Sequence, residues 1–270
     1  MSEVKRSALS VNYCEEHRLL AQRNGREYRI LIAMPTEPPP PGGYPVLYAL
    51  DGDATFLTMA EATRLQTRKP HGFDPAVVVG IGYPSGEPFD MSRRCYDFTM
   101  PAEEGTLPER PDGRPWPENG GADLFLDFLE HDLLPFIAGL FPVDASRRTL
   151  FGHSLGGLLV LHALFSQPSL FSRYAAGSPS IWWGNGAILE QFDAFVRRFD
   201  GRLPSVRLLF TLGAEELSDM VEDAEKLFAK LQPFKDDNGG FRPEFVKFPE
   251  EEHVSVLPAA ISRVVKFGLS

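Results

Sequence analysis

Hydrophobic positions in this chain fall into short continuous runs that alternate with longer segments of helical periodicity. The runs are rich in β-branched and aromatic residues, as in parallel strands that are buried on both faces. They occupy residues 46–50, 76–81, 147–151, 174–178, 206–212 and 241–248. The helical segments occupy residues 56–66, 122–140, 155–165, 187–199, 221–231 and 254–267. This alternation predicts an α/β fold with a doubly wound, mostly parallel sheet and helices on both of its faces.

Two segments depart from the alternation. Residues 18–21 and 28–33 are strand-like runs on either side of Asn24-Gly25, a pair that strongly favours a tight antiparallel hairpin. Residues 84–118 are rich in proline and glycine and poor in apolar side chains, and they predict a long loop excursion. Long loops in compact domains commonly carry function. We therefore expect one domain over residues 1–270, with an N-terminal hairpin and a Pro-rich excursion.

The composition is that of a globular chain, with 270 residues, 43% hydrophobic and 24% charged, which is enough for one sizeable core. The net charge of −10 repels nucleic-acid phosphates and anionic membranes, so both are poor partners. No charged leader with an apolar stretch opens the chain and no apolar run is long enough to span a bilayer, which predicts a cytoplasmic location. Cys14 and Cys95 allow one disulfide and do not indicate a zinc site.

The most informative motif is Gly152-His153-Ser154-Leu155-Gly156, which lies between a predicted strand and a predicted helix. A strand, a sharp turn at serine and a helix together form a nucleophile elbow. We expect Gly152 and Gly156 to leave space that a Cβ would fill. The elbow lifts the Ser154 hydroxyl toward the positive end of the following helix. The alternative is an ordinary strand-to-helix turn that happens to contain a serine.

A serine nucleophile requires a base, because a free hydroxyl is a poor nucleophile near neutral pH. His17 precedes the first strand and His71 lies in a loop. His131 and His162 lie inside predicted helices. His153 is adjacent to the serine, where the turn is expected to aim its side chain elsewhere. His253 lies between the last strand and the last helix, where α/β-hydrolases place the general base. The alternative for His253 is a surface residue that caps the helix.

The acid that holds the base is expected after the strand at 206–212. Glu215 and Glu216 are both there, and Asp219 is a more distant candidate. From these residues alone the choice stays open, and so does a Ser-His dyad that works without an acid. The oxyanion hole requires two amides. The amide of Leu155 provides one, and the loop that contains Gly52 is expected to provide the other.

Six segments jointly resemble the siderophore esterases, the trilactone hydrolases that open enterobactin and salmochelin. They are residues 48–52, 94–99, 152–157, 178–183, 213–216 and 253–258. These enzymes belong to a wider esterase family of α/β-hydrolases that includes S-formylglutathione hydrolases, feruloyl esterases and mycolyltransferases. The resemblance covers nearly the whole chain. Of the six segments, only the elbow and Ser-Pro-Ser-Ile-Trp-Trp at 178–183 are specific when taken singly.

The resemblance implies a role for particular residues. It implies that Ser154 and His253 are the catalytic pair and that Gly52 and Leu155 form the oxyanion hole. It favours Glu216 over Glu215 as the acid. It also implies that Arg94, in the excursion, faces the substrate. Some relatives work as a Ser-His dyad, so the acid stays open.

The residues themselves suggest how a substrate would be bound. Arg93 and Arg94 are candidate anion binders, because guanidinium groups engage carboxylate or catecholate oxygens in a bidentate manner. Trp182 and Trp183 are candidates for an aromatic wall, with Trp183 as the predicted substrate-binding residue. The alternatives are ion pairs of the arginines with Asp97 or Glu103, and packing of the tryptophans in the core.

We therefore predict a serine esterase that needs no metal and no cofactor and acts on a small-molecule ester. An anionic catecholate siderophore is the leading candidate substrate. One alternative is another ester or thioester hydrolase or acyltransferase of the same fold, of the feruloyl, acetyl-xylan or S-formylglutathione type. Another is a hydrolase-fold binding protein that has lost catalysis. The sequence leaves the natural ester and the oligomeric state open.

Overall fold

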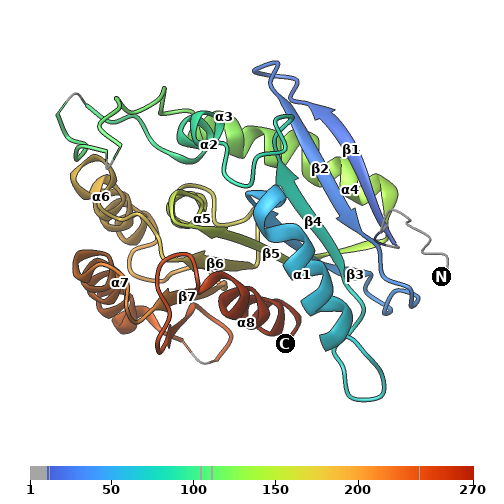
Figure 1. Ribbon diagram of the computed structural model, residues 1–270. Coiled ribbons are helices and arrows are strands. Elements are labelled where there is room, and N and C mark those ends of the chain that lie inside the picture. Colours follow the sequence, from blue (N-terminus) through green and yellow to red (C-terminus); the bar gives the residue numbers. More distant parts are fainter. Residues whose placement is uncertain (1–10, 12, 104, 111, 237) are drawn as a thin grey trace, which may run out of the picture.

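An eight-stranded sheet runs through the centre of the molecule (Figure 1). The computed structural model describes residues 11, 13–103, 105–110, 112–236 and 238–270. The strands are β1 (Cys14–Leu20), β2 (Glu27–Ala33), β3 (Tyr44–Leu50), β4 (Val77–Gly82), β5 (Val143–His153), β6 (Arg173–Gly177), β7 (Arg207–Gly213) and β8 (Arg242–Phe248). Their spatial order is β1-β2-β4-β3-β5-β6-β7-β8. The β1–β2 and β2–β4 pairs are antiparallel and all the others are parallel, which confirms the predicted fold class.

Helices cover both faces of this sheet. They are α1 (Gly52–Gln66), α2 (Met91–Phe98), α3 (Ala122–Phe128), α4 (Leu134–Leu140), α5 (Leu155–Ser166), α6 (Trp183–Arg198), α7 (Ser218–Leu231) and α8 (Leu257–Leu269). A π-helical turn (Leu129–Leu133) joins α3 to α4, and a 3₁₀ turn (Gln232–Phe234) follows α7. In Figure 1, α1 and α8 lie in front of the sheet, where they pack against each other. The other helices pack on the opposite face.

The two faces of the sheet explain why the predicted strands are continuously apolar. On β3, Tyr48 and Leu50 belong to the core beneath the larger group of helices. Leu47 and Ala49 belong to the core beneath α1 and α8. Successive side chains of a strand point to opposite faces, so a strand covered on both sides must be apolar at every position. All seven residues of β3 are buried accordingly.

The structure differs from the predicted elements in two places. The excursion at 84–118, expected to be a loop, contains α2. Asp90 caps this helix by accepting a hydrogen bond from the amide of Arg93 at 3.0 Å, and Cys95 and Phe98 bury its inner side. The helix predicted at 122–140 is instead divided by the π-helical turn, where the buried Asp132 accepts from the amide of Gln22 at 3.1 Å.

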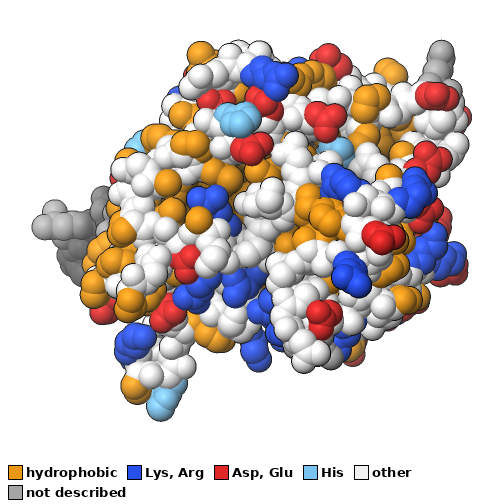
Figure 2. All heavy atoms as spheres, turned by 180° about the vertical axis from the view of Figure 1, so that it is seen from behind, with side chains coloured by type: hydrophobic (Ala, Val, Ile, Leu, Met, Phe, Trp, Pro, Cys, Tyr) orange, Lys and Arg blue, Asp and Glu red, His pale blue; other side chains and the backbone are white. Residues whose placement is uncertain are grey.

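On the face of the molecule seen from behind, acidic and basic side chains are interspersed with hydrophobic and polar ones (Figure 2). Within the described residues, no helix has the length and apolar character needed to cross a membrane.

The β5–α5 turn is packed so closely that it depends on particular glycines. A Cβ on Gly152 would overlap the carbonyl oxygen of Gly156 and come within 2.8 Å of Leu50. A Cβ on Gly157 would lie 2.5 Å from the carbonyl oxygen of Gly177. At Gly156, by contrast, the nearest atoms are 3.6 Å away, an ordinary van der Waals distance. The expectation that Gly156 leaves necessary space is therefore wrong, and Gly157 has that role together with Gly152.

This difference gives a test within a single motif. We expect Gly152→Ala to lower the free energy of unfolding by about 1–3 kcal/mol, because backbone atoms must move to admit the methyl group. Gly156→Ala is expected to be neutral, or to stabilise by up to about 1 kcal/mol, as alanine does in helices. Urea unfolding of both variants measures the difference. Equal losses for the two variants would contradict this account of the turn.

Candidate active site

Five neighbouring strands end at one edge of the sheet, and each is followed by a residue of the candidate site. Gly52 follows β3, Ser154 follows β5 and Ser178 follows β6. Glu216 follows β7, and His253 follows β8. These strands are consecutive in the sheet, so their carboxyl ends bring together residues that are distant in sequence. The winding of the chain reverses between β3 and β5, and open α/β sheets bind ligands at such a switch point.

Ser154 is held in a strained turn. Its φ of 59° and ψ of −117° place a non-glycine residue in a sparsely populated region of backbone conformation. The amide of Ser154 donates to the carbonyl oxygen of Gly177 at 2.9 Å, which ties the turn to β6. The Ser154 Oγ atom lies 3.4 Å from the Oγ atom of Ser180. This turn, directly before α5, is the geometry expected of a nucleophile elbow.

A chain of hydrogen bonds joins β6, β7 and the segment after β8. The Ser178 hydroxyl donates to Glu216 Oε1 at 2.6 Å, and the amide of Gly213 donates to the same oxygen at 2.7 Å. Glu216 Oε2 lies 2.7 Å from Nδ1 of His253. Burial tends to raise the pKa of the Glu216 carboxyl, but hydrogen bonds from His253, Ser178 and Gly213 outweigh it and lower the pKa from 4.5. Glu216 is therefore an ionised acceptor that fixes the imidazole of His253.

Within the described residues, the Nδ1 atom of His253 is bonded to Glu216, and its other ring nitrogen, Nε2, has no hydrogen-bond partner. Among the described side chains, Ser154 pairs with Ser180, and no hydrogen bond joins it to His253. The ring of His153 lies next to that of His253, with centroids 4.6 Å apart. The sequence suggested that the turn aims the side chain of His153 elsewhere. In the structure, its ring instead lies beside the candidate base. The pKa of His153 is lowered to about 3, mainly by burial and secondly by the nearby His253. This second imidazole therefore stays neutral.

The two predicted oxyanion-hole amides belong to the first residues of α1 and α5. Amides in the first turn of a helix have no partner within that helix. In the described part of the chain, the amides of Gly52 and Leu155 donate neither to a side chain nor to a turn carbonyl. A Cβ on Gly52 would lie 2.7 Å from the amide nitrogen of Ile81. Glycine is therefore required here for packing against β4, a reason that the sequence did not indicate.

Arg94 is buried in a bidentate ion pair. Its Nε and Nη2 atoms donate to the two carboxylate oxygens of Asp51 at 2.9 and 3.0 Å. Nη2 also donates to the carbonyl oxygen of His153 at 3.2 Å. Arg94 is only 4% exposed, because its guanidinium is enclosed by these partners, so it offers little surface to a substrate. Neither Asp97 nor Glu103, the expected alternative partners, forms this pair.

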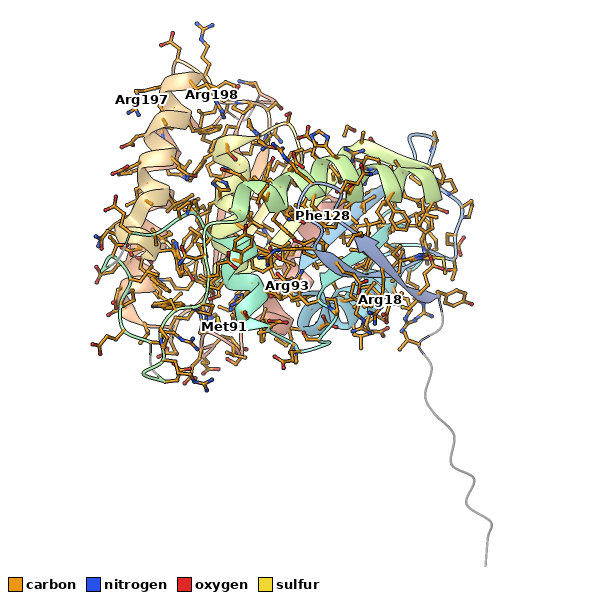
Figure 3. All side chains as sticks on the ribbon, turned by 90° about the horizontal axis from the view of Figure 1, so that it is seen from above. Arg18, Met91, Arg93, Phe128, Arg197 and Arg198 are labelled. Carbon is orange, nitrogen blue, oxygen red and sulfur yellow. The ribbon has the colours of Figure 1, made fainter. Side chains whose placement is uncertain are left out.

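Arg93, labelled on α2 in Figure 3, also has a structural position. Its Nη2 atom donates to the carbonyl oxygen of Glu27 at 3.0 Å, and its guanidinium lies over the rings of Tyr28 and Tyr83. Together, Arg93 and Arg94 attach α2 to β2 and to the turns at the carboxyl edge of the sheet. The excursion is therefore anchored by its two central arginines.

The tryptophans form a cluster with one residue of the excursion. Trp183 is fully buried, and its Nε1 atom donates to the carbonyl oxygen of Met100 at 3.0 Å. Trp182 and Trp116 are partly exposed, with ring centroids 5.8 Å apart. Arg110 lies over Trp116 at 5.6 Å. The exposed aromatic surface belongs to Trp182 and Trp116, whereas Trp183 supports them from the core.

Three residues near the elbow were not identified as site residues from the sequence. They are Ser178, Ser180 and the buried Asp51. Ser178 and Ser180 lie in the segment at 178–183, which contributes to the resemblance and contains the two tryptophans, but whose serines were not singled out. The signal that was available is their position: polar residues directly after an apolar strand lie at the ligand-binding edge of the sheet. The described residues contain no group of three or more His, Cys, Asp or Glu side chains placed to hold a metal ion.

The buried ion pair leads to a stability prediction. We expect Arg94→Met to lower the free energy of unfolding by about 3–5 kcal/mol, because it leaves the carboxylate of Asp51 buried without a partner. Arg64→Met is the matched control, since Arg64 pairs with Glu61 on the exposed side of α1. Chemical denaturation at pH 7 should show a large loss for the first variant and no measurable loss for the second. A small loss at Arg94 would mean that the pair contributes little to the fold.

Comparisons with known proteins agree with this arrangement. Residues 21–227 match the family model described as "Putative esterase". The chain is 46% identical over 260 residues to ferri-bacillibactin esterase BesA of Bacillus subtilis, covering 94% of this chain and 89% of that protein. It is 36% identical over 248 residues to the siderophore enterobactin esterase of Emericella nidulans, covering 82% and 80%.

A solved structure extends the likeness to three dimensions. The crystal structure of the BES protein from Bacillus cereus superposes with a TM-score of 0.91 at 36% identity, covering 99% of this chain and all of that one (100%). The family-model match over residues 21–227 includes Ser154 and Glu216. The chain therefore belongs to this esterase family and is a carboxylic ester hydrolase of the α/β-hydrolase fold.

Proposed function

We propose that this protein hydrolyses an ester bond of a siderophore, with Ser154 as nucleophile and His253 as general base. The substrate class is supported by its relatives, which are named as esterases of ferri-bacillibactin and enterobactin. The single observation that carries the catalytic assignment is the Ser178–Glu216–His253 chain of hydrogen bonds beside the strained Ser154 turn. A cytoplasmic location and a single domain over residues 1–270 stay predictions.

The proposed reaction follows from these positions. The Ser154 hydroxyl rotates from Ser180 toward Nε2 of His253, which takes its proton as Oγ attacks the ester carbonyl. The amides of Gly52 and Leu155 receive the oxyanion. His253 then protonates the departing alkoxide, and water hydrolyses the acyl-enzyme by the same route. Glu216 holds the imidazole in the required tautomer and stabilises it when it is protonated.

We assign recognition of the siderophore to an aromatic rim, which consists of Arg110 and Trp116 of the excursion and of Trp182 directly before α6. Trp182 and Trp116 offer partly exposed rings, and Arg110 adds a positive charge beside them. Aromatic rings and a guanidinium suit a ligand that is both aromatic and anionic, such as a catecholate. Arg110 is itself paired with Asp112 at 2.7 Å, but it lies beside the partly exposed Trp116, whereas Arg94 is buried. We therefore propose Arg110 in place of Arg94 as the arginine that meets the substrate.

The nucleophile is tested by covalent labelling. We expect a fluorophosphonate probe to modify Ser154 in the folded protein, because the probe reacts only with an activated hydroxyl. Ser154→Ala should lose labelling and reduce ester turnover by at least about 10³-fold, as loss of a triad member does in serine hydrolases. Peptide mass spectrometry identifies the labelled residue. Ser180→Ala, which removes the neighbouring hydroxyl, should retain the label at Ser154.

The substrate class is tested by comparing esters. A triscatecholate trilactone should be cleaved with kcat/KM at least about 10²-fold above that for p-nitrophenyl acetate, because only the larger substrate reaches the aromatic rim. Similar, slow rates on both substrates would indicate a general esterase. Unchanged turnover in Ser154→Ala would instead contradict the catalytic assignment itself.

The role of Glu216 is tested by removing its charge. Glu216→Gln keeps the size of the side chain but cannot stabilise a protonated imidazole. We expect kcat to fall by about 10²–10⁴-fold, the range associated with loss of the orienting carboxylate. Glu215→Gln is the matched control and should retain most of the activity. Equal activity of Glu216→Gln and the unmodified protein would indicate a Ser-His dyad.

A further inference from the structure

We propose that the segment Ser178-Pro179-Ser180 is a brace that positions both the acid and the nucleophile, with Ser178 and Ser180 as positioning residues. This inference rests on the proposed function. It is carried by one juxtaposition: a three-residue segment at the end of β6 contacts Glu216 with one hydroxyl and Ser154 with the other.

The first contact controls the acid. The Ser178 side chain is fully buried, and its hydroxyl gives Glu216 Oε1 a short hydrogen bond of 2.6 Å. The amide of Gly213 is the second donor to that oxygen, so both bonds together leave Oε2 directed at His253. Ser178 has a φ of 40°, a conformation that a non-glycine residue rarely adopts. The site retains a strained serine at the point where its hydroxyl reaches the carboxylate.

The second contact controls the nucleophile. Ser180 is 1% exposed, and its amide donates to the carbonyl oxygen of Ser154 at 3.1 Å. Its Oγ atom lies 3.4 Å from the Oγ atom of Ser154 and is the hydrogen-bond partner of that hydroxyl among the described residues. Ser180 therefore holds both the backbone of the elbow and the resting rotamer of the nucleophile.

The brace itself is held by its neighbours. The amide of Ser178 donates to the carbonyl oxygen of Thr211 on β7 at 2.8 Å. Pro179 has a fixed φ and packs against α5, where a Cβ on Gly157 would lie 3.0 Å from its Cα. At the other end, the buried Trp183 anchors the segment. Because these contacts fix the segment at both ends, the distance between its two hydroxyls is set by the fold.

This arrangement gives Ser178 and Ser180 different kinetic signatures. Loss of the Ser178 hydroxyl removes a donor that lowers the pKa of Glu216, so that pKa rises. The titratable groups beside this carboxylate are His253 and, next to it, the neutral His153. Because the proposed mechanism needs the ionised carboxylate, a higher pKa of Glu216 moves the acid limb of the kcat/KM profile to higher pH. Loss of the Ser180 hydroxyl affects only the nucleophile and should leave the limb in place.

The test measures kcat, KM and the pH profile of hydrolysis of p-nitrophenyl acetate. For Ser178→Ala we expect kcat to fall about tenfold, KM to stay unchanged and the acid limb to move up by about 0.5–1 pH unit, the scale of one hydrogen bond to a charged group. Ser178→Gly also lacks the hydroxyl but relieves the positive φ. It should show the same pH shift with better stability, which separates the hydroxyl from the strain.

For Ser180→Ala we expect kcat to fall by about three- to tenfold, the effect of one neutral hydrogen bond, with no shift of the acid limb. Ser180→Thr keeps the hydroxyl and should recover most of kcat. Ser172→Ala is the matched control, because Ser172 precedes β6 at its other end and donates to the carbonyl oxygen of Arg148. It should match the unmodified protein in every measurement.

Three outcomes would overturn the brace. The first is an acid limb that does not move in either Ser178 variant. The second is a Ser180→Thr variant whose kcat is no higher than that of Ser180→Ala. The third is a fall in kcat that only parallels the loss of folding stability across the variants. Each leaves the proposed function intact if Ser154→Ala remains inactive. Activity in Ser154→Ala would contradict the proposed function and the brace together.

Discussion

The buried pair of Asp51 and Arg94 is the interaction on which the site depends. Asp51 lies in the turn after β3, Arg94 comes from the excursion, and the same guanidinium reaches the carbonyl oxygen of His153 before the elbow. One side chain therefore joins three segments around the switch point of the sheet. A buried carboxylate requires such a partner, since a charge without one is strongly destabilising. The pair consequently fixes the two turns that present Gly52 and Leu155.

Strain is concentrated where those turns leave the sheet. The neighbouring strands β3, β5 and β6 are each followed by a non-glycine residue at positive φ, namely Asp51, Ser154 and Ser178. Such conformations persist only where surrounding contacts determine them. Here the contacts are the Arg94 fork, the Gly177 carbonyl and the Glu216 carboxylate. The strained turns raise polar groups above the edge of an otherwise apolar sheet.

The acid of the proposed triad has more support from the structure than from motif matching. The residues of the loop after β7 left Glu215, Glu216 and a Ser-His dyad as alternatives. In the structure, Glu216 is buried and bonded to His253, to Ser178 and to the amide of Gly213. Such a fully bonded carboxylate supports the triad over the dyad. The family membership of the chain is independent of this point, because it rests on the similarity of the whole chain to known esterases.

The sequence alone determined the features that depend on local pattern. Apolar periodicity predicted the strands and helices, Asn24-Gly25 predicted the hairpin, and glycine spacing around Ser154 predicted the elbow. The position of His253 after the last strand made it the candidate base, an assignment that stays a prediction. These signals involve residues close together in the chain, where turn chemistry and side-chain alternation act directly.

Tertiary structure decided what depends on contacts between distant residues. Arg94 pairs with Asp51, and Trp183 is buried and bonded to the carbonyl oxygen of Met100. The Pro-rich excursion contains the helix α2. Packing requires glycine at position 157 and not at position 156. Tertiary structure also joined Ser178 and Ser180 to residues of other strands. No local pattern reveals such partners, because burial and hydrogen bonding at these positions are set by which strands lie side by side in the sheet.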